Sequence, residues 1–159
     1  MARSGTGGRL IVQMLEPAEA DRQTEVFGNP MKDNPGYRNV ITPLTPAASR
    51  NFLALLQLGG IETPTILPQF NRERLISTLR LQQLITVLPP DIDAISRPFA
   101  VSLPATRLSY AVLLIDLKPG NWTVISPARR RETYTVDARR PVLYLPELSP
   151  GLWFFQPQL

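Results

Sequence analysis

The sequence of 159 residues contains no cysteine and no histidine. Their absence excludes disulfide bonds, thiol chemistry, ordinary zinc sites and every histidine-dependent catalytic triad. No run of apolar residues approaches the length of about 18 that a membrane-spanning helix needs. We therefore expect no catalytic residues, no metal, no cofactor and no membrane contact, and we predict that the protein is not an enzyme.

Lysine is scarce as well, because 15 of the 17 basic residues are arginines. Proline is abundant, and the 17 prolines are spread from Pro17 to Pro157. Proline removes a helix donor and clashes with the preceding turn, so this spacing excludes a long helical bundle or coiled coil. With 43% hydrophobic residues the chain can still bury the core of an ordinary domain, which excludes global disorder.

Residues 1–45 have the composition of an extended N-terminal arm. The segment has one short apolar run, Leu10-Ile11-Val12, which we expect to pair as an edge strand and to contact a partner. The run is too short for the apolar part of a signal peptide, so we expect synthesis in the cytoplasm. Further along, Asn-Pro and Pro-Gly pairs mark turns. The segment has too little apolar surface to offset its own ordering entropy.

Residues 46–88 are predicted to form a helical and loop segment that packs on the core. Thr45 is a suitable N-cap, Pro46 suits the first helical position, and Gly59-Gly60 would end a helix of about three and a half turns. A second helix is expected to begin after Asn71. The β-branched residues Ile85, Thr86 and Val87 favour a strand in the second half of that stretch, up to Leu88.

Residues 89–159 have the punctuation of an antiparallel β-sandwich, of jelly-roll or immunoglobulin-like type. Short apolar runs alternate with proline, glycine and charged turn residues. The expected strands are Pro98–Leu103, Leu108–Leu117, Trp122–Ser126, Glu132–Val136, Val142–Leu145 and Leu152–Gln156. The predicted fold is therefore mainly β, with one or two short helices and the N-terminal arm.

One motif occurs twice in the predicted sandwich. Asp116-Leu-Lys-Pro-Gly-Asn-Trp122 and Glu147-Leu-Ser-Pro-Gly-Leu-Trp153 share the order acid, Leu, any residue, Pro, Gly, any residue, Trp. In such a sequence a strand ends, Pro-Gly turns the chain, and the aromatic side chain packs back over the corner. This turn resembles a Leu-x-Pro-Gly corner of fibronectin type III-like sandwiches, and it implies a β-sandwich without indicating a ligand.

The densest positive charge is an arginine cluster around one predicted strand. Arg129, Arg130 and Arg131 precede the strand Glu132–Ala138, and Arg139 and Arg140 follow it. At about 3.3 Å per residue the two basic ends lie about 23 Å apart. The cluster could be solvated loop charge, could bind carboxylates of a protein interface, or could bind a nucleic-acid backbone.

Three consecutive aromatic residues, Trp153, Phe154 and Phe155, form the second candidate contact surface. In a strand they point to both faces, so one face belongs to the core and the other needs cover from a partner or from the domain itself. A carbohydrate-binding sandwich is a further interpretation, and it requires an exposed Trp122 or Trp153 ring.

These features together favour a structural subunit of a large assembly over an enzyme. The hypothesis is a virion component of a tailed phage, such as a capsid-decorating, neck or baseplate protein, which acts in the virion and is made in the host cytoplasm. Its arm and β domain would bind other protein subunits, as a homo-oligomer or in many copies. The alternative is a nucleic-acid-binding module that uses the strand Arg129–Arg140.

Overall fold

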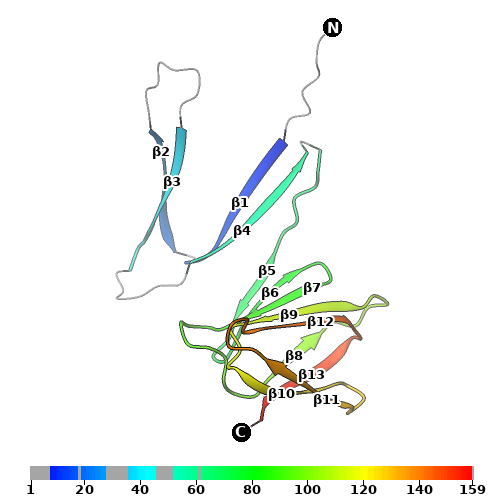
Figure 1. The fold of residues 1–159 in the computed structure, drawn as a ribbon. Coiled ribbons are helices and arrows are strands. Elements are labelled where there is room, and N and C mark those ends of the chain that lie inside the picture. The colour runs from blue at the N-terminus through cyan, green and yellow to red at the C-terminus, as the bar shows by residue number, and fades with distance from the viewer. Residues whose placement is uncertain (1–7, 18, 28–35, 46–51, 61, 159) are drawn as a thin grey trace. The chain divides into compact units, whose positions relative to one another are not determined.

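The computed structural model describes the chain except for residues 1–7, 18, 28–35, 46–51, 61 and 159 (Figure 1). The described residues form strands and turns but no helix. The chain divides into two compact units, Met1–Thr65 and Ile66–Leu159, and the division into segments at residues 45 and 88 stays a prediction. Across these described ranges no helix is long and apolar enough to span a membrane.

The first unit consists of two antiparallel strand pairs. Its strands are β1 (Gly8–Glu16), β2 (Ala20–Phe27), β3 (Gly36–Pro43) and β4 (Leu53–Gly60). β1 pairs with β4, and β2 pairs with β3. The predicted strand Leu10–Val12 lies within β1.

The predicted helix that begins at Thr45 is wrong where the structure describes it. Leu53–Gly60 is strand β4, in which half-buried and exposed residues alternate strictly. Its leucines fit helical spacing, but they also pair across strands, with Leu56 opposite Val12 and Leu58 opposite Leu10. Pairing with a segment more than forty residues away overrides the local preference. Residues 46–51, the start of the predicted helix, lie outside the described residues.

The second unit is a sandwich of two sheets. Its strands are β5 (Gln69–Arg72), β6 (Ser77–Leu81), β7 (Leu84–Leu88), β8 (Phe99–Leu103), β9 (Tyr110–Ile115), β10 (Gly120–Ile125), β11 (Arg131–Val136), β12 (Val142–Leu148) and β13 (Gly151–Pro157). One sheet has the order β12-β9-β7-β6-β5 and the other β11-β10-β13-β8. All pairs are antiparallel except β7 with β9. From β7 onward the chain crosses repeatedly between the sheets (Figure 1).

The fold class predicted for residues 89–159 is confirmed, whereas the predicted helices are absent from the described residues. The expected second helix after Asn71 is instead the hairpin β6–β7, preceded by β5. The chain reverses at Gln82, whose φ of 55° places it in the left-handed region. The expected strand in the second half of this stretch is confirmed as β7.

The core lies between the two sheets and comes from alternate residues of their strands. Val87 of β7 and Leu114 of β9 are fully buried in the five-stranded sheet, and Trp122 and Phe155 are buried in the four-stranded one. Phe99 of β8 stacks on Phe155 with ring centroids 4.9 Å apart, and its ring is tilted against Trp122 at 6.0 Å. The three rings join β8, β10 and β13 into one packed layer.

The repeated motif forms two equivalent corners, as predicted. Asp116 and Glu147 both have positive φ, of 54° and 59°, and Gly120 and Gly151 have φ of 131° and 128°. In each corner the indole Nε1 of the tryptophan donates a hydrogen bond of 2.9 Å to the carbonyl four residues earlier, that of Lys118 or Ser149. Each tryptophan therefore closes its own corner while it begins the next strand.

The two corner glycines differ in their surroundings, which gives a test of the corner geometry. A Cβ at Gly151 would lie 2.6 Å from Cγ of Pro127, whereas a Cβ at Gly120 would meet nothing within 4 Å. We expect Gly120→Ala to lower the free energy of unfolding by about 1–3 kcal/mol through its backbone conformation alone. Gly151→Ala should cost more, and Pro127→Ala in that background should recover part of the loss. Urea unfolding of the four proteins measures these changes, and equal costs at the two glycines would contradict the described packing at Pro127.

Candidate ligand-binding face

The four-stranded sheet has an outer face that carries polar side chains together with exposed apolar ones. Because Trp122, Val124 and Phe155 point into the core, their neighbours along β10 and β13 point outward. The outward side chains of β11, β10 and β13 are those of Arg131, Thr133, Thr135, Asn121, Thr123, Ile125, Leu152, Phe154 and Gln156. We call this surface the outer face.

The strand register sets these side chains in rows across the sheet. Thr133, Thr123 and Gln156 are direct neighbours on β11, β10 and β13. The next row contains Arg131, Ile125 and Phe154. Adjacent strands lie about 4.8 Å apart, so Arg131 on β11 and Phe154 on β13 lie about 10 Å apart in this row.

Hydroxyl and amide groups of the outer face are linked by hydrogen bonds. The side-chain amide of Gln158, just beyond β13, donates to Oγ1 of Thr123 at 3.0 Å and to Oγ1 of Thr133 at 3.4 Å. Thr135 donates from its hydroxyl to Oδ1 of Asn121 at 2.9 Å. These bonds hold the polar groups in place and leave their remaining donors and acceptors available to a ligand.

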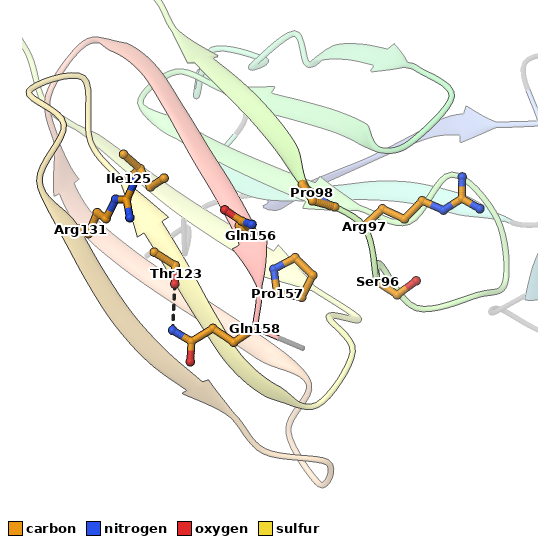
Figure 2. A pocket seen from close by; sticks show the side chains of 9 residues that line it. All are labelled: Ser96, Arg97, Pro98, Thr123, Ile125, Arg131, Gln156, Pro157 and Gln158. Carbon is orange, nitrogen blue, oxygen red and sulfur yellow. Dashed lines mark hydrogen bonds between the residues drawn. The ribbon is translucent and has the colours of Figure 1, made fainter.

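A hollow of about 440 Å³ lies at one end of the outer face (Figure 2). In the view of Figure 2, Arg131 and Arg97 lie at opposite sides of the hollow, with Gln156 and Gln158 between them, and the guanidinium group of Arg97 extends away from the other lining side chains. Arg97 precedes β8, and Thr123 and Ile125 of β10 contribute to the lining. A shallow site of this size, with fixed polar groups and two cations, suits a polar, negatively charged ligand.

No carboxylate lines the hollow or competes for its arginines. The lining residues include neither Asp nor Glu. Among the described residues no acidic side chain pairs with Arg131 or Arg97. Glu132 follows Arg131 in the chain, but it belongs to the opposite side of β11, where it accepts a hydrogen bond of 2.5 Å from the Tyr134 hydroxyl. The positive charge at the hollow is therefore not neutralised locally.

The five predicted arginines lie at the two ends of β11, and the structure separates their settings. Arg129, with φ of 62°, and Arg130 form the turn from β10 into β11, in which the Arg130 amide donates to Oγ of Ser126. Arg131 alone lines the hollow. Arg139 and Arg140 form the turn after the strand, where the Arg139 amide donates to Oδ1 of Asp137 at 2.7 Å. Partner binding by these residues stays a prediction.

The aromatic run divides between the faces of β13, as its alternation predicted. Phe155 is fully buried, Trp153 packs against the core, and Phe154 is 45% exposed on the outer face. Trp122 is 1% exposed, so the interpretation that its ring is a ligand platform is wrong. The aromatic side chain that the outer face does expose, Phe154, is the neighbour of the predicted platform Trp153.

In the first unit, the predicted contact residues lie on a ribbon with an apolar face. Leu10 and Val12 of β1 are 56% and 49% exposed, and they lie opposite Leu58 and Leu56 of β4. Ile11 points to the other side of the ribbon, opposite Gln57. The role of Leu10, Ile11 and Val12 in binding a partner stays a prediction.

Sequence reasoning found Arg131 but missed Thr123, Gln156, Gln158 and Arg97. The available signal was period-two alternation, which is visible in Trp122-Thr123-Val124 and assigns Thr123 to the other face, but which the three consecutive aromatic residues before Gln156 hide. That these residues gather around Arg131 depends on the register between strands far apart in the sequence. No three His, Cys, Asp or Glu side chains in the described part of the chain form a group that could hold a metal ion.

The fold and the outer face define an all-β sandwich domain with a polar, cationic hollow. Residues 73–157, from just before β6 to the end of β13, match the family described as Heparinase II C-terminal domain. The match covers more than half of the chain, and the chain therefore belongs to this family. No curated protein gives a significant match to the chain.

The family membership corrects the function predicted from the sequence. A domain of a carbohydrate-active enzyme family is neither the expected virion subunit nor the alternative nucleic-acid-binding module. The prediction went wrong because an arginine cluster and an apolar strand are compatible with many partners. The family name refers to the C-terminal domain of an enzyme, and such a domain need not carry the catalytic residues.

The contact between Tyr134 and Glu132 gives a testable prediction for the strand that carries Arg131. The hydrogen bond to Glu132, then burial and the charge of Glu132, raise the pKa of Tyr134 to about 12 from its usual 10.0. A raised pKa means that this contact stabilises the fold fully below pH 10 and that the contribution is lost as the pH rises toward 12. Glu132→Gln should bring the pKa of Tyr134 down toward 10.

Tyrosinate absorbance, measured against pH in parent and variant with Tyr134→Phe subtracted, follows this ionisation. Glu62→Gln, an exposed glutamate of the first unit, is the matched control and should leave the pKa of Tyr134 where it is. An unchanged titration of Tyr134 in Glu132→Gln would show that the carboxylate is not its partner.

Proposed function

We propose that the sandwich Ile66–Leu159 is a non-catalytic domain that binds an acidic polysaccharide on its outer face. The observation that carries this proposal is the hollow between Arg131 and Arg97, which has two cations and no carboxylate in its lining. Guanidinium groups bind sulfate and carboxylate oxygens through paired hydrogen bonds, and they remain charged at every physiological pH. An anionic ligand therefore gains attraction here without displacing an existing ion pair.

The groups around the arginines suit a sugar chain. Thr123, Thr133 and Gln158 are already linked to one another by hydrogen bonds, so they meet sugar hydroxyls at little further cost in side-chain entropy. Phe154 offers an exposed ring in the same row as Arg131, on which the apolar face of a sugar ring can stack. The separation of about two strand spacings between them is comparable to the length of a disaccharide.

The family supports the same class of ligand. Heparinase II is named for heparin, a polysaccharide that carries sulfate and carboxylate groups. In this chain the proposed role is binding rather than cleavage. Tyr134 with its pKa of about 12 is protonated near neutral pH and unsuited to act as a base, and the sequence offers neither histidine nor cysteine. The domain would bind an acidic polysaccharide and hold it close to the enzyme that acts on it.

Replacement of Arg131 tests the proposal. We expect the parent protein to bind heparin with an affinity that falls steeply with added salt, because the contacts are ionic. Arg131→Gln should weaken binding about tenfold, the equivalent of one charge-assisted hydrogen bond. Isothermal titration calorimetry with heparin oligosaccharides, and with uncharged maltohexaose as the ligand control, measures both effects.

Arg139→Gln is the matched control variant, because it removes the same charge from the other end of β11. Its side chain does not line the hollow. Binding should therefore fall by much less in this variant than in Arg131→Gln. Equal losses in the two variants would show attraction to net charge alone, and equal binding of maltohexaose would rule out an anion site.

A further inference from the structure

A second recess, distinct from the hollow, lies where the two sheets of the sandwich part. It is a groove of about 290 Å³, lined by residues of β5 and β6 from one sheet and of β8 from the other. β5 and β8 are the last strands of their sheets in the described topology, so the groove follows the open edge of the sandwich. Its floor is apolar and includes Ile76, Ile85 and Val101.

The groove exists because the inward positions of β6 are polar. Arg80 is the register partner of Ile85 and Thr78 that of Val87, and both partners belong to the buried core. Arg80 and Thr78 therefore face inward, where leucine or valine would close the gap between the sheets. Two polar residues at core-facing positions lower the stability of the fold. Proteins retain such residues most often at functional sites.

Arg80 is held in place without a counter-ion. Its guanidinium carbon lies 5.7 Å from the ring centroid of Tyr110, which is 2% exposed. Nη2 is 3.5 Å from the Tyr110 hydroxyl, and Nε donates to the Gln82 carbonyl at 3.2 Å. Among the described residues no carboxylate forms an ion pair with Arg80. A half-buried, oriented guanidinium with donors to spare is a site for an anion.

Glu73, the acidic residue that lines the groove, does not form an ion pair with Arg80. Glu73 accepts a hydrogen bond of 2.9 Å from Nδ2 of Asn71, which engages its carboxylate within the loop between β5 and β6. Thr78 adds a hydroxyl group, and Asn71, its register partner on β5, adds a side-chain amide on the same side of the sheet. The groove thus combines one available cation, neutral polar groups on the wall formed by β5 and β6, and an apolar floor.

We propose that this groove binds a single sugar acid, with its carboxylate on Arg80. The ring hydroxyls meet Thr78 and Asn71, and the apolar side of the ring lies against Val101. The volume suits a monosaccharide, and the neighbouring hydroxyl and amide of Thr78 and Asn71 suit a ligand with several hydroxyls better than an acidic peptide, whose backbone would leave them unmatched. This inference does not rest on the proposed function of the outer face, because the groove shares no lining residue with the hollow.

Sodium glucuronate is the probe, and the amide chemical shifts of the protein, measured by NMR, are the readout. We expect saturable shifts in β6 and β8 at millimolar glucuronate. Glucose lacks the carboxylate and propionate lacks the hydroxyls, so each should bind at least about tenfold more weakly. A disaccharide with a terminal glucuronate distinguishes the source: binding equal to that of the free acid indicates the end of a polysaccharide chain, and exclusion indicates a free sugar acid.

Variants of Arg80 and Thr78 distinguish glucuronate binding in the groove from binding elsewhere on the surface. Arg80→Gln should weaken glucuronate binding about tenfold or more, and Arg80→Lys should restore part of it because a cation remains. Thr78→Val keeps the shape of the side chain and should also weaken binding. Arg74→Gln, an exposed arginine outside the groove, and Arg131→Gln, in the hollow, should have no effect on these shifts.

Three results would overturn the proposal. They are glucuronate shifts that persist in Arg80→Gln, shifts confined to the hollow around Arg131, and tighter binding of the acidic peptide Gly-Glu-Gly than of glucuronate. The dispersion of the amide spectrum shows directly whether each variant is folded. If Arg80→Gln fails to fold, Thr78→Val and Arg80→Lys decide the outcome.

Discussion

The packing of Phe99, Trp122 and Phe155 fixes the register of the four-stranded sheet, and the outer face depends on that register. The three rings come from β8, β10 and β13, and in the core the ring of Phe99 contacts both of the others. In a strand a slip of one residue exchanges the two faces. A slip of β13 would bury Gln156 and expose Phe155. The aromatic core therefore excludes such a slip, and the row of Thr133, Thr123 and Gln156 on the outer face depends on a contact on the opposite side of the sheet.

The parts of the fold that could be predicted from sequence are those set by local chemistry. The corners at Gly120 and Gly151 require a residue without Cβ, and a tryptophan follows each at the same spacing, so their equivalence is visible in the sequence. The strand around Tyr134 was likewise marked by alternation and by arginines at its ends. The position of Arg131 was predicted for this reason, although its ligand was not.

The predictions that failed concern segments whose structure is decided by pairing with strands far away in the sequence. The leucines of β4 satisfy helical spacing and strand spacing alike, and only their pairing with Leu10 and Val12 settles the matter. The same holds for the two recesses. Nothing in the local sequence of Arg80 shows that Thr78 and Arg80 face Val101 across a gap between sheets, because that placement follows from the sandwich topology.

The position of β13 within its sheet also bears on how the domain is made. β13 is the last strand of the sandwich in the sequence, yet it lies between β10 and β8. Until residues 151–157 have left the ribosome, β8 has no neighbour in its own sheet and the aromatic layer lacks Phe155. Because domains fold as units, this sheet closes only after translation of β13 is complete. The emerging chain thus carries β8 as an unpaired apolar strand from the time it is made until β13 follows, a state in which chaperone binding has most effect.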